Sequence, residues 1–148
     1  MHVKQQIREA VGTILEAAPT NWKTVKETRL PSDRDIFPYL MAYCESEVLD
    51  PLYIHSPIEY MRDIGLVIKG HALLSNDTES FEDSLDNILE EIEQTLTEPS
   101  LKAQLSGVQS LILNSTDSEI TDDDDRTYAT VTVNYTVRVN TTEGTPTI

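Results

Sequence analysis

Hydrophobic and polar residues alternate most regularly near the C-terminal end of the chain, from Thr130 to Val139. Period-two alternation of β-branched and aromatic residues predicts a strand with one buried face and one solvated face. The buried face is expected to hold Val131, Val133, Tyr135, Val137 and Val139. Three other stretches are also expected to be strands, namely Ile36 to Val48, Ile58 to Leu74 and Val108 to Asn114.

Two segments have the helical period instead. From Val3 to Ala18 the apolar residues recur every three or four positions, and Pro19 ends the pattern. Trp22 is expected to pack at the end of this helix. A second helix is expected to run to about Thr97, before Pro99. Its apolar stripe consists of Phe81, Leu85, Ile88, Leu89, Ile92 and Leu96.

The order of these elements, with hairpin-like connections, predicts an α+β fold. We expect a mostly antiparallel four-stranded sheet with two main helices packed on one face and a protruding β-hairpin. The hairpin spans Ile36 to Leu74 and carries Pro51 and Pro57 near its tip.

The same pattern predicts one domain over residues 1–140 and a flexible C-terminal tail over residues 141–148. The segment 23–34 is polar and has room for one brief strand at 24–29. The segment 114–126 is expected to be rich in turns, with Asp122 to Asp125 as a solvated turn.

Charge changes this picture, because the chain of 148 residues has a formal net charge of −15. Between Asp77 and Asp125, fifteen acidic residues accompany a single base, Lys102, whereas the rest of the chain is nearly neutral. Tight phosphate binding depends on Lys and Arg, so this distribution argues against it. No apolar run is long enough to span a bilayer, and the N-terminus lacks the apolar core of a signal peptide. The single cysteine, Cys44, is compatible with a reducing cytoplasm.

The sequence offers little for catalysis or metal binding. His2, His55 and His71 are widely separated, and none stands in a zinc-binding motif. Cys44 is more typical of a small packed residue than of a nucleophile. The aspartates 122–125 lack the glycine and the final acid that a calcium loop needs. We therefore expect no catalytic residue, no metal and no cofactor, which favours a binding module over an enzyme.

Four carboxylates, Asp83, Asp86, Glu90 and Glu93, lie opposite the apolar stripe of the second helix. Like charges at this spacing cost a few tenths of a kcal/mol per pair in an isolated helix. Two interpretations remain open. The ridge either serves as a solubilising face, or several copies of it line a passage or meet a basic partner.

Several segments, taken in order, resemble one protein family. They are Ile36-Phe-Pro-Tyr-Leu-Met-Ala-Tyr-Cys-Glu, Tyr60-Met-Arg-Asp-Ile-Gly-Leu-Val-Ile-Lys-Gly, Asp83-Ser-Leu-Asp-Asn-Ile-Leu-Glu-Glu-Ile-Glu and Tyr128-Ala-Thr-Val-Thr-Val-Asn-Tyr-Thr-Val. In this order the chain resembles the tail terminators of long-tailed bacteriophages, the lambda gpU-like minor tail proteins. The resemblance covers nearly the whole chain and rests on pattern, since no catalytic motif is involved.

The resemblance implies a virion protein at the junction of tail and neck, assembled in the host cytoplasm. Such a protein is a monomer in solution and closes into a hexameric ring on the last ring of the tail tube. The ring stops tube growth and presents a docking face to the head-completion proteins of the neck, while DNA passes through its centre without being bound.

On this reading the four carboxylates of the second helix are candidates to face the channel. Aromatic residues and methionine are enriched at protein interfaces. The candidates for contacts with other subunits or with the tube are therefore Tyr39, Met41, Tyr43, Tyr53 and Tyr60. Packing within the sheet is an equally good interpretation of these five residues. Two other functions remain open: an acidic inhibitor that mimics DNA, and another head–tail joining protein such as a stopper.

Overall fold

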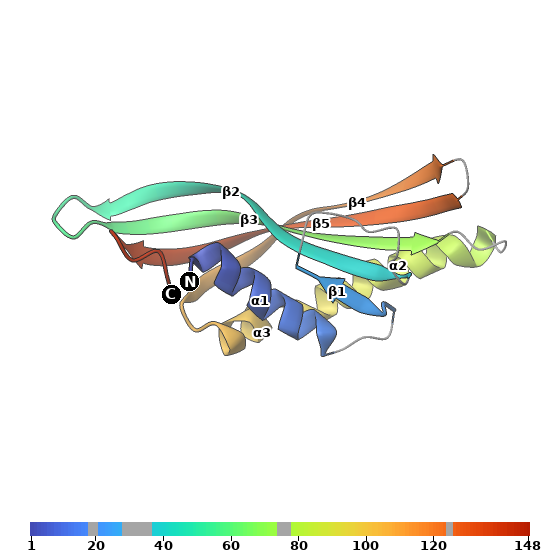
Figure 1. The fold of residues 1–148 in the computed structure, drawn as a ribbon, viewed down its shortest axis with the longest axis horizontal. Coiled ribbons are helices and arrows are strands. Elements are labelled where there is room, and N and C mark those ends of the chain that lie inside the picture. The colour runs from blue at the N-terminus through green and yellow to red at the C-terminus, as the bar shows by residue number, and fades with distance from the viewer. Residues whose placement is uncertain (18–20, 28–36, 74–77, 124–125) are drawn as a thin grey trace.

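The computed structural model describes residues 1–17, 21–27, 37–73, 78–123 and 126–148. Along these residues the chain forms α1 (Val3–Glu16), β1 (Thr24–Lys26), β2 (Tyr39–Tyr53), β3 (Glu59–Leu73), α2 (Thr78–Thr95), α3 (Glu98–Gln104), β4 (Val108–Asp123) and β5 (Arg126–Thr142). The strands form one sheet in the order β1-β2-β3-β5-β4. Figure 1 shows the three helices on one face of this sheet, which we call the inner face. The opposite face is called the outer face.

The expected four-stranded, mostly antiparallel sheet with two helices is wrong. A fifth strand, β1, pairs in parallel with β2 at Tyr39–Met41, so the sheet is mixed. With three residues, β1 is too short to show a periodic pattern. A third helix, α3, begins after Thr97 and contains Pro99 in its first turn. Proline is tolerated there because the first N–H groups of a helix have no intrahelical partner.

The core lies between the inner face of the sheet and the helices. The alternation in β5 is confirmed, since its five predicted core residues are at most 3 % exposed. The described residues of the helical stripes are also buried, apart from Leu89, which is partly buried. Ala18, at the expected end of the first stripe, lies outside the described residues. Trp22 is buried as expected, and its Nε1–H donates a hydrogen bond to the carbonyl oxygen of Leu15 at 3.0 Å. One layer of helices on one sheet is therefore sufficient to form a continuous core.

Strand β4 is longer than expected. Residues 114–123, which were expected to form turns, pair with β5 as far as Asp123 opposite Arg126. The side chains of residues 112–120 are exposed on both faces of the strand. Because neither face is buried, the sequence shows no alternation here, and backbone hydrogen bonds to β5 supply the regular structure.

The C-terminal segment 141–148, expected to be a flexible tail, makes defined contacts in the structure. Strand β5 continues to Thr142, and the side chain of Thr141 is buried. The backbone N–H of Val3 then donates to Pro146 at 2.7 Å. Gln6 exchanges two hydrogen bonds with the backbone of Ile148, at 2.8 Å and 3.1 Å. The two ends of the chain therefore lie beside each other (Figure 1).

Candidate assembly surfaces

The two long hairpins of the sheet point to opposite ends of the molecule, and the β2–β3 hairpin extends beyond the N-terminal end of α1 (Figure 1). This hairpin was predicted from the sequence. Its strands β2 and β3 have fifteen residues each and pair from Tyr39 opposite His71 to Tyr53 opposite Glu59. We call residues 48–60 the apolar arm. Its exposed apolar side chains are Val48 (60 % exposed), Leu49 (39 %), Leu52 (39 %), Tyr53 (56 %) and Ile54 (92 %).

The opposite end of the sheet is formed by the β4–β5 hairpin, and we call residues 114–129 the polar arm. Its exposed positions from Asn114 to Glu119 are all polar, and Ile120 is its one large exposed apolar residue among those whose side chains the structure describes. On the outer face, Asn134 donates a hydrogen bond to Ser115 across the two strands at 3.0 Å. The side chains that the polar arm exposes are therefore mainly polar.

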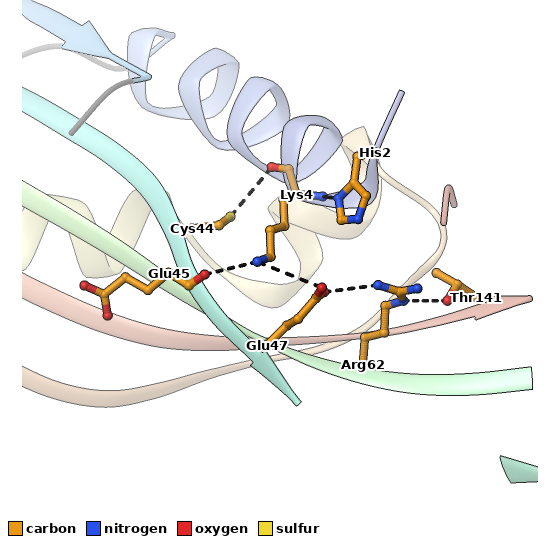
Figure 2. Close-up of polar contacts among 7 residues, drawn as sticks. All are labelled: His2, Lys4, Cys44, Glu45, Glu47, Arg62 and Thr141. Atoms are coloured by element: carbon orange, nitrogen blue, oxygen red, sulfur yellow. Dashed lines mark hydrogen bonds and ion pairs between the residues drawn. The ribbon is translucent and has the colours of Figure 1, made fainter. Parts of the chain in front are cut away.

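An ion pair holds the base of the apolar arm (Figure 2). The guanidinium of Arg62 donates from Nε to Thr141 at 2.7 Å and from Nη1 to the carboxylate of Glu47 at 3.2 Å. The side chains of Arg62 and Glu47 are 11 % and 20 % exposed. These three residues belong to β3, β5 and β2, so one guanidinium joins three strands at the point where the arm leaves the body.

The N-terminus of α1 meets the same site (Figure 2). The ammonium of Lys4 donates to the carbonyl oxygen of Glu45 at 3.1 Å and lies 4.0 Å from Glu47. Strand β2 has a register shift between Cys44 and Glu47, which exposes this carbonyl to the helix. His2 caps α1 by accepting a hydrogen bond from the backbone N–H of Lys4 at 3.2 Å. Lys4 therefore links the N-terminal end of α1 to the base of the apolar arm.

A second ion pair crosses the outer face near the same point. Arg138 donates to the two carboxylate oxygens of Asp63 at 2.8 Å and 2.9 Å. These hydrogen bonds lower the pKa of Asp63 from its ordinary value, against a smaller opposing effect of burial. The Arg138 side chain is 41 % exposed, so this pair lies in a more solvated environment than the pair of Arg62 and Glu47.

The five interface candidates fall into two groups. Tyr53 and Tyr60 lie on the apolar arm, where Tyr53 is exposed. Tyr39, Met41 and Tyr43 are at most 8 % exposed and lie in β2 within the body of the sheet. The ring of Tyr39 stacks on the imidazole of His71, with 4.9 Å between the ring centroids. Burial lowers the pKa of His71.

The four channel candidates, Asp83, Asp86, Glu90 and Glu93, are all exposed on the side of α2 that faces away from the core. The structure brings them together as one ridge, as the helical period predicted. Below this ridge, burial raises the pKa of Tyr135 to about 12, with a smaller contribution from the negative charge of Glu93.

Sequence reasoning did not single out the other exposed apolar side chains of the arm, Val48, Leu49, Leu52 and Ile54. The signal was present, because the run Val48-Leu-Asp-Pro-Leu-Tyr-Ile contains one charged residue and prolines exclude a helix. Its apolar residues have no helical or period-two pattern, so the sequence predicted only that this segment forms the tip of the hairpin.

An apolar groove lies at the open end of the β2–β3 hairpin, where α2 packs against the sheet. Its volume is about 390 Å³, and it is lined by Asn21, Phe37, Pro38, Ala72, Leu73, Phe81, Ser84 and Ile88. Leu73 is 42 % exposed, whereas Phe81 and Ile88 form the buried floor. Near this groove, the carboxylate of Glu91 accepts hydrogen bonds from the backbone and side-chain N–H groups of Asn21.

Cys44 is buried, and its Sγ lies 3.6 Å from the carbonyl oxygen of Lys4. Among the described residues, no three His, Cys, Asp or Glu side chains gather in a group that could hold a metal ion. Asp124 and Asp125 of the expected solvated turn lie outside the described residues. No helix in the described ranges is both long and apolar enough to cross a membrane.

Comparison with known proteins identifies a structural relative. No family model matches the chain. No curated protein matches it either. Among solved structures, the chain is similar to a protein chain in the virion of a native gene transfer agent (GTA) particle, with a TM-score of 0.55. The two share 12 % sequence identity, and the match covers 90 % of this chain and 94 % of that one. At this identity the likeness shows a shared fold.

Proposed function

We propose that this chain is a structural protein of a virion and, within that class, a tail terminator. In this role it forms a ring, expected to be a hexamer, on the last ring of the tail tube. The ring stops tube polymerisation and offers a docking face to the head-completion or neck connector protein. The chain breaks no covalent bond, because its function is to replace one protein interface with another.

The observation that carries the proposal is the apolar arm on a fold shared with a virion component. Monomeric soluble proteins rarely expose large contiguous apolar patches, and such patches mark protein–protein contacts. Five of the large hydrophobic side chains exposed in the described part of the chain lie between Val48 and Ile54. The shared fold extends over nearly the full length of both chains, which supports an assembly role for the whole domain.

The test uses the tail-tube protein encoded with this chain. Tube protein is allowed to polymerise with increasing amounts of the purified chain, and tube lengths are measured by negative-stain electron microscopy. A terminator should shorten the tubes in proportion to its concentration and should be found at one tube end after gold labelling. Tubes of unchanged length with no labelled end would overturn the proposal.

The same experiment separates the alternatives. A chain that leaves tube length unchanged but binds the connector is another head–tail joining protein. A chain that binds neither of them but captures a restriction or CRISPR nuclease in a pull-down is a DNA mimic.

The acidic ridge has its own test within this proposal. An acidic wall repels a phosphate backbone and lets DNA slide without binding. Changing Asp83, Asp86, Glu90 and Glu93 to Lys is expected to slow DNA ejection while rings still form. A matched control changes Glu16, Glu45, Asp117 and Glu119 to Lys, which alters the net charge equally at exposed positions away from α2. Equal ejection rates in the two variants would exclude a channel role for the ridge.

A further inference from the structure

We propose that the tip of the apolar arm of one copy inserts into the apolar groove of a second copy. The subunits then associate head to tail. The inference deepens the proposed function and rests on it, because it names the contact by which copies of this chain would form a ring.

The tip is suited to insertion. Ile54 is 92 % exposed at the end of a narrow two-stranded arm, with Leu52 and Tyr53 next to it. Pro51 and Pro57 fix the φ angles of the backbone on both sides of the tip. The Arg62–Glu47 ion pair and its contact with Thr141 hold the base of the arm (Figure 2). An arm that is ordered before binding loses less conformational entropy when it binds.

The groove is suited to receive apolar side chains. Its floor is formed by Phe81 and Ile88, and Leu73 stands exposed at its side. A volume of about 390 Å³ lies in the range of pockets that hold small-molecule ligands. One or two aliphatic side chains of the tip therefore fit within it.

The arm cannot reach the groove of its own chain. Tip and groove lie at the closed and open ends of the same hairpin, whose strands have fifteen residues each. At about 3.3 Å per residue, the two sites are roughly 50 Å apart. An arm that occupies the groove must therefore belong to another copy, and the contact joins two different surfaces of one protein. Repeated contacts of this heterologous kind produce closed rings or open filaments.

The polar groups around the two sites are compatible with this contact. The apolar arm carries the exposed acids Asp50 and Glu59 and has no Lys or Arg. At the groove, the exposed residue Lys23 lies beside Pro38, since its backbone N–H donates to the Pro38 carbonyl at 2.8 Å. The carboxylate of Glu91 near the groove already accepts hydrogen bonds from Asn21. Opposite charges at the rim of an interface steer association.

Disulfide trapping tests the contact in the full chain. In the Ile54→Cys, Leu73→Cys double variant, a mild oxidant should yield a ladder of dimers, trimers and larger species on a non-reducing gel. All variants also carry Cys44→Ala, so that the native buried thiol takes no part in the cross-linking. Single-cysteine variants can then form at most dimers, because a ladder requires two different sites on each subunit. The matched control combines Ser118→Cys on the polar arm with Leu73→Cys, and it should give no ladder.

Two results of the gel experiment would overturn the inference, and a third concerns cross-links to other proteins. One is the absence of a ladder at millimolar protein concentration although both new thiols react with a maleimide. The other is a ladder of equal intensity from the Ser118→Cys control. A cross-link that forms only to the tube protein or to the connector also overturns it, because the groove or arm then serves a different partner.

A second pair of variants measures the strength of the contact. Ile54→Asp and Leu73→Asp each place a carboxylate in an apolar contact, and each should weaken self-association at least tenfold in analytical ultracentrifugation. The outcome is distinguishable from a failure of the proposed function. If the chain caps tubes but gives no ladder, the terminator role is kept and this contact is excluded. If the chain gives a ladder but does not cap tubes, the contact is kept and the terminator role is excluded.

Discussion

The apolar arm and the polar arm have the same construction but opposite surfaces. Each is the closed end of a long antiparallel hairpin, and each extends one end of the same sheet (Figure 1). Residues 48–54 expose five large hydrophobic side chains, whereas residues 114–121 expose Ile120 as their one large hydrophobic side chain. In the polar arm, strand β4 pairs with β5 along one edge, and its exposed side chains are mainly polar. The apolar arm leaves apolar area exposed, so it gains free energy only when a partner covers it.

The two arms also differ in how they are anchored. The apolar arm leaves the body at the Arg62–Glu47 pair and at the register shift that Lys4 contacts. The polar arm is held by cross-strand pairs such as the one between Asn114 and Thr136, at 2.6 Å on the outer face. This comparison indicates that orientation matters more for the apolar arm, and the following predictions test that difference.

The largest effect is expected for Arg62→Met. This change leaves the carboxylate of Glu47, which is 20 % exposed, with Lys4 at 4.0 Å as its remaining ion-pair partner. Loss of one partner from a mostly buried ion pair costs about 3 kcal/mol. Urea unfolding should show this loss in the free energy of unfolding. Hydrogen exchange should accelerate for the amides of residues 48–60 and not for those of 114–123.

The control for this prediction is Lys4→Met. Lys4 is 27 % exposed and lies farther from Glu47, so its removal should cost less than about 1 kcal/mol. If Lys4→Met costs as much as Arg62→Met, the guanidinium does not anchor the apolar arm in particular.

The next effect concerns Tyr135, which lies between Leu66 and Leu113 where the two hairpins meet. Its hydroxyl is buried and has no hydrogen-bond partner among the described residues. Tyr135→Phe removes this unsatisfied group and should raise the free energy of unfolding by about 1 kcal/mol. A lower midpoint of thermal unfolding than that of the wild type would contradict the conclusion that the Tyr135 hydroxyl is buried without a partner.

The same residue gives a prediction at alkaline pH. The pKa of Tyr135 is raised to about 12 in the folded state, so unfolding becomes more favourable as the pH rises above the ordinary value of 10. Between pH 10 and 11 the wild type should lose about 1 kcal/mol more stability than Tyr135→Phe. Equal losses would mean that the hydroxyl is solvated.

A smaller effect is expected at the solvated ion pair of Asp63 and Arg138. Because the pKa of Asp63 is lowered in the folded state, its stabilisation is present at neutral pH and is lost as the pH falls from about 4 through the folded pKa. For a pair this exposed, the contribution is small, because solvent screens it. Asp63→Asn should therefore reduce stability at pH 7, and the deficit should shrink as the pH falls below about 4. A deficit of equal size at pH 7 and at pH 2 would indicate a packing effect.

The smallest effect on stability is expected for Ile54→Asp and Ile120→Asp, one on each arm. Both side chains are already exposed, at 92 % and 54 %, so each change should alter the free energy of unfolding by less than about 0.5 kcal/mol. Self-association should fall in the Ile54 variant alone. A fall of equal size in the Ile120 variant would remove the functional distinction between the arms.

The sequence predicted the elements that have one buried face. The stripes of α1 and α2 and the alternation of β5 were correct because burial imposes a period on the side chains. The brief strand expected at 24–29 is present as β1, but its pairing with β2 was not predicted. The outer half of β4 was missed because it is paired through the backbone while its side chains remain exposed.

The candidate site was predicted in part for the same reason. The acidic ridge of α2 follows from the helical period, so its four members could be identified together. The apolar arm was not singled out as a surface, because its hydrophobic residues lack a periodic pattern and are the same types that fill a core. Among the aromatic candidates of β2, composition did not distinguish the buried Tyr39 and Tyr43 from the exposed Tyr53.

By itself the sequence determined an α+β chain with two amphipathic helices, long strands, a protruding hairpin and a concentrated acidic segment. These features depend on residues close together along the chain. The tertiary structure decided the β1-β2-β3-β5-β4 order, the Arg62–Glu47–Thr141 anchor and the placement of the groove opposite the tip. These features join segments that are up to about a hundred residues apart. No local pattern encodes such contacts, because they form only when the core brings the strands together.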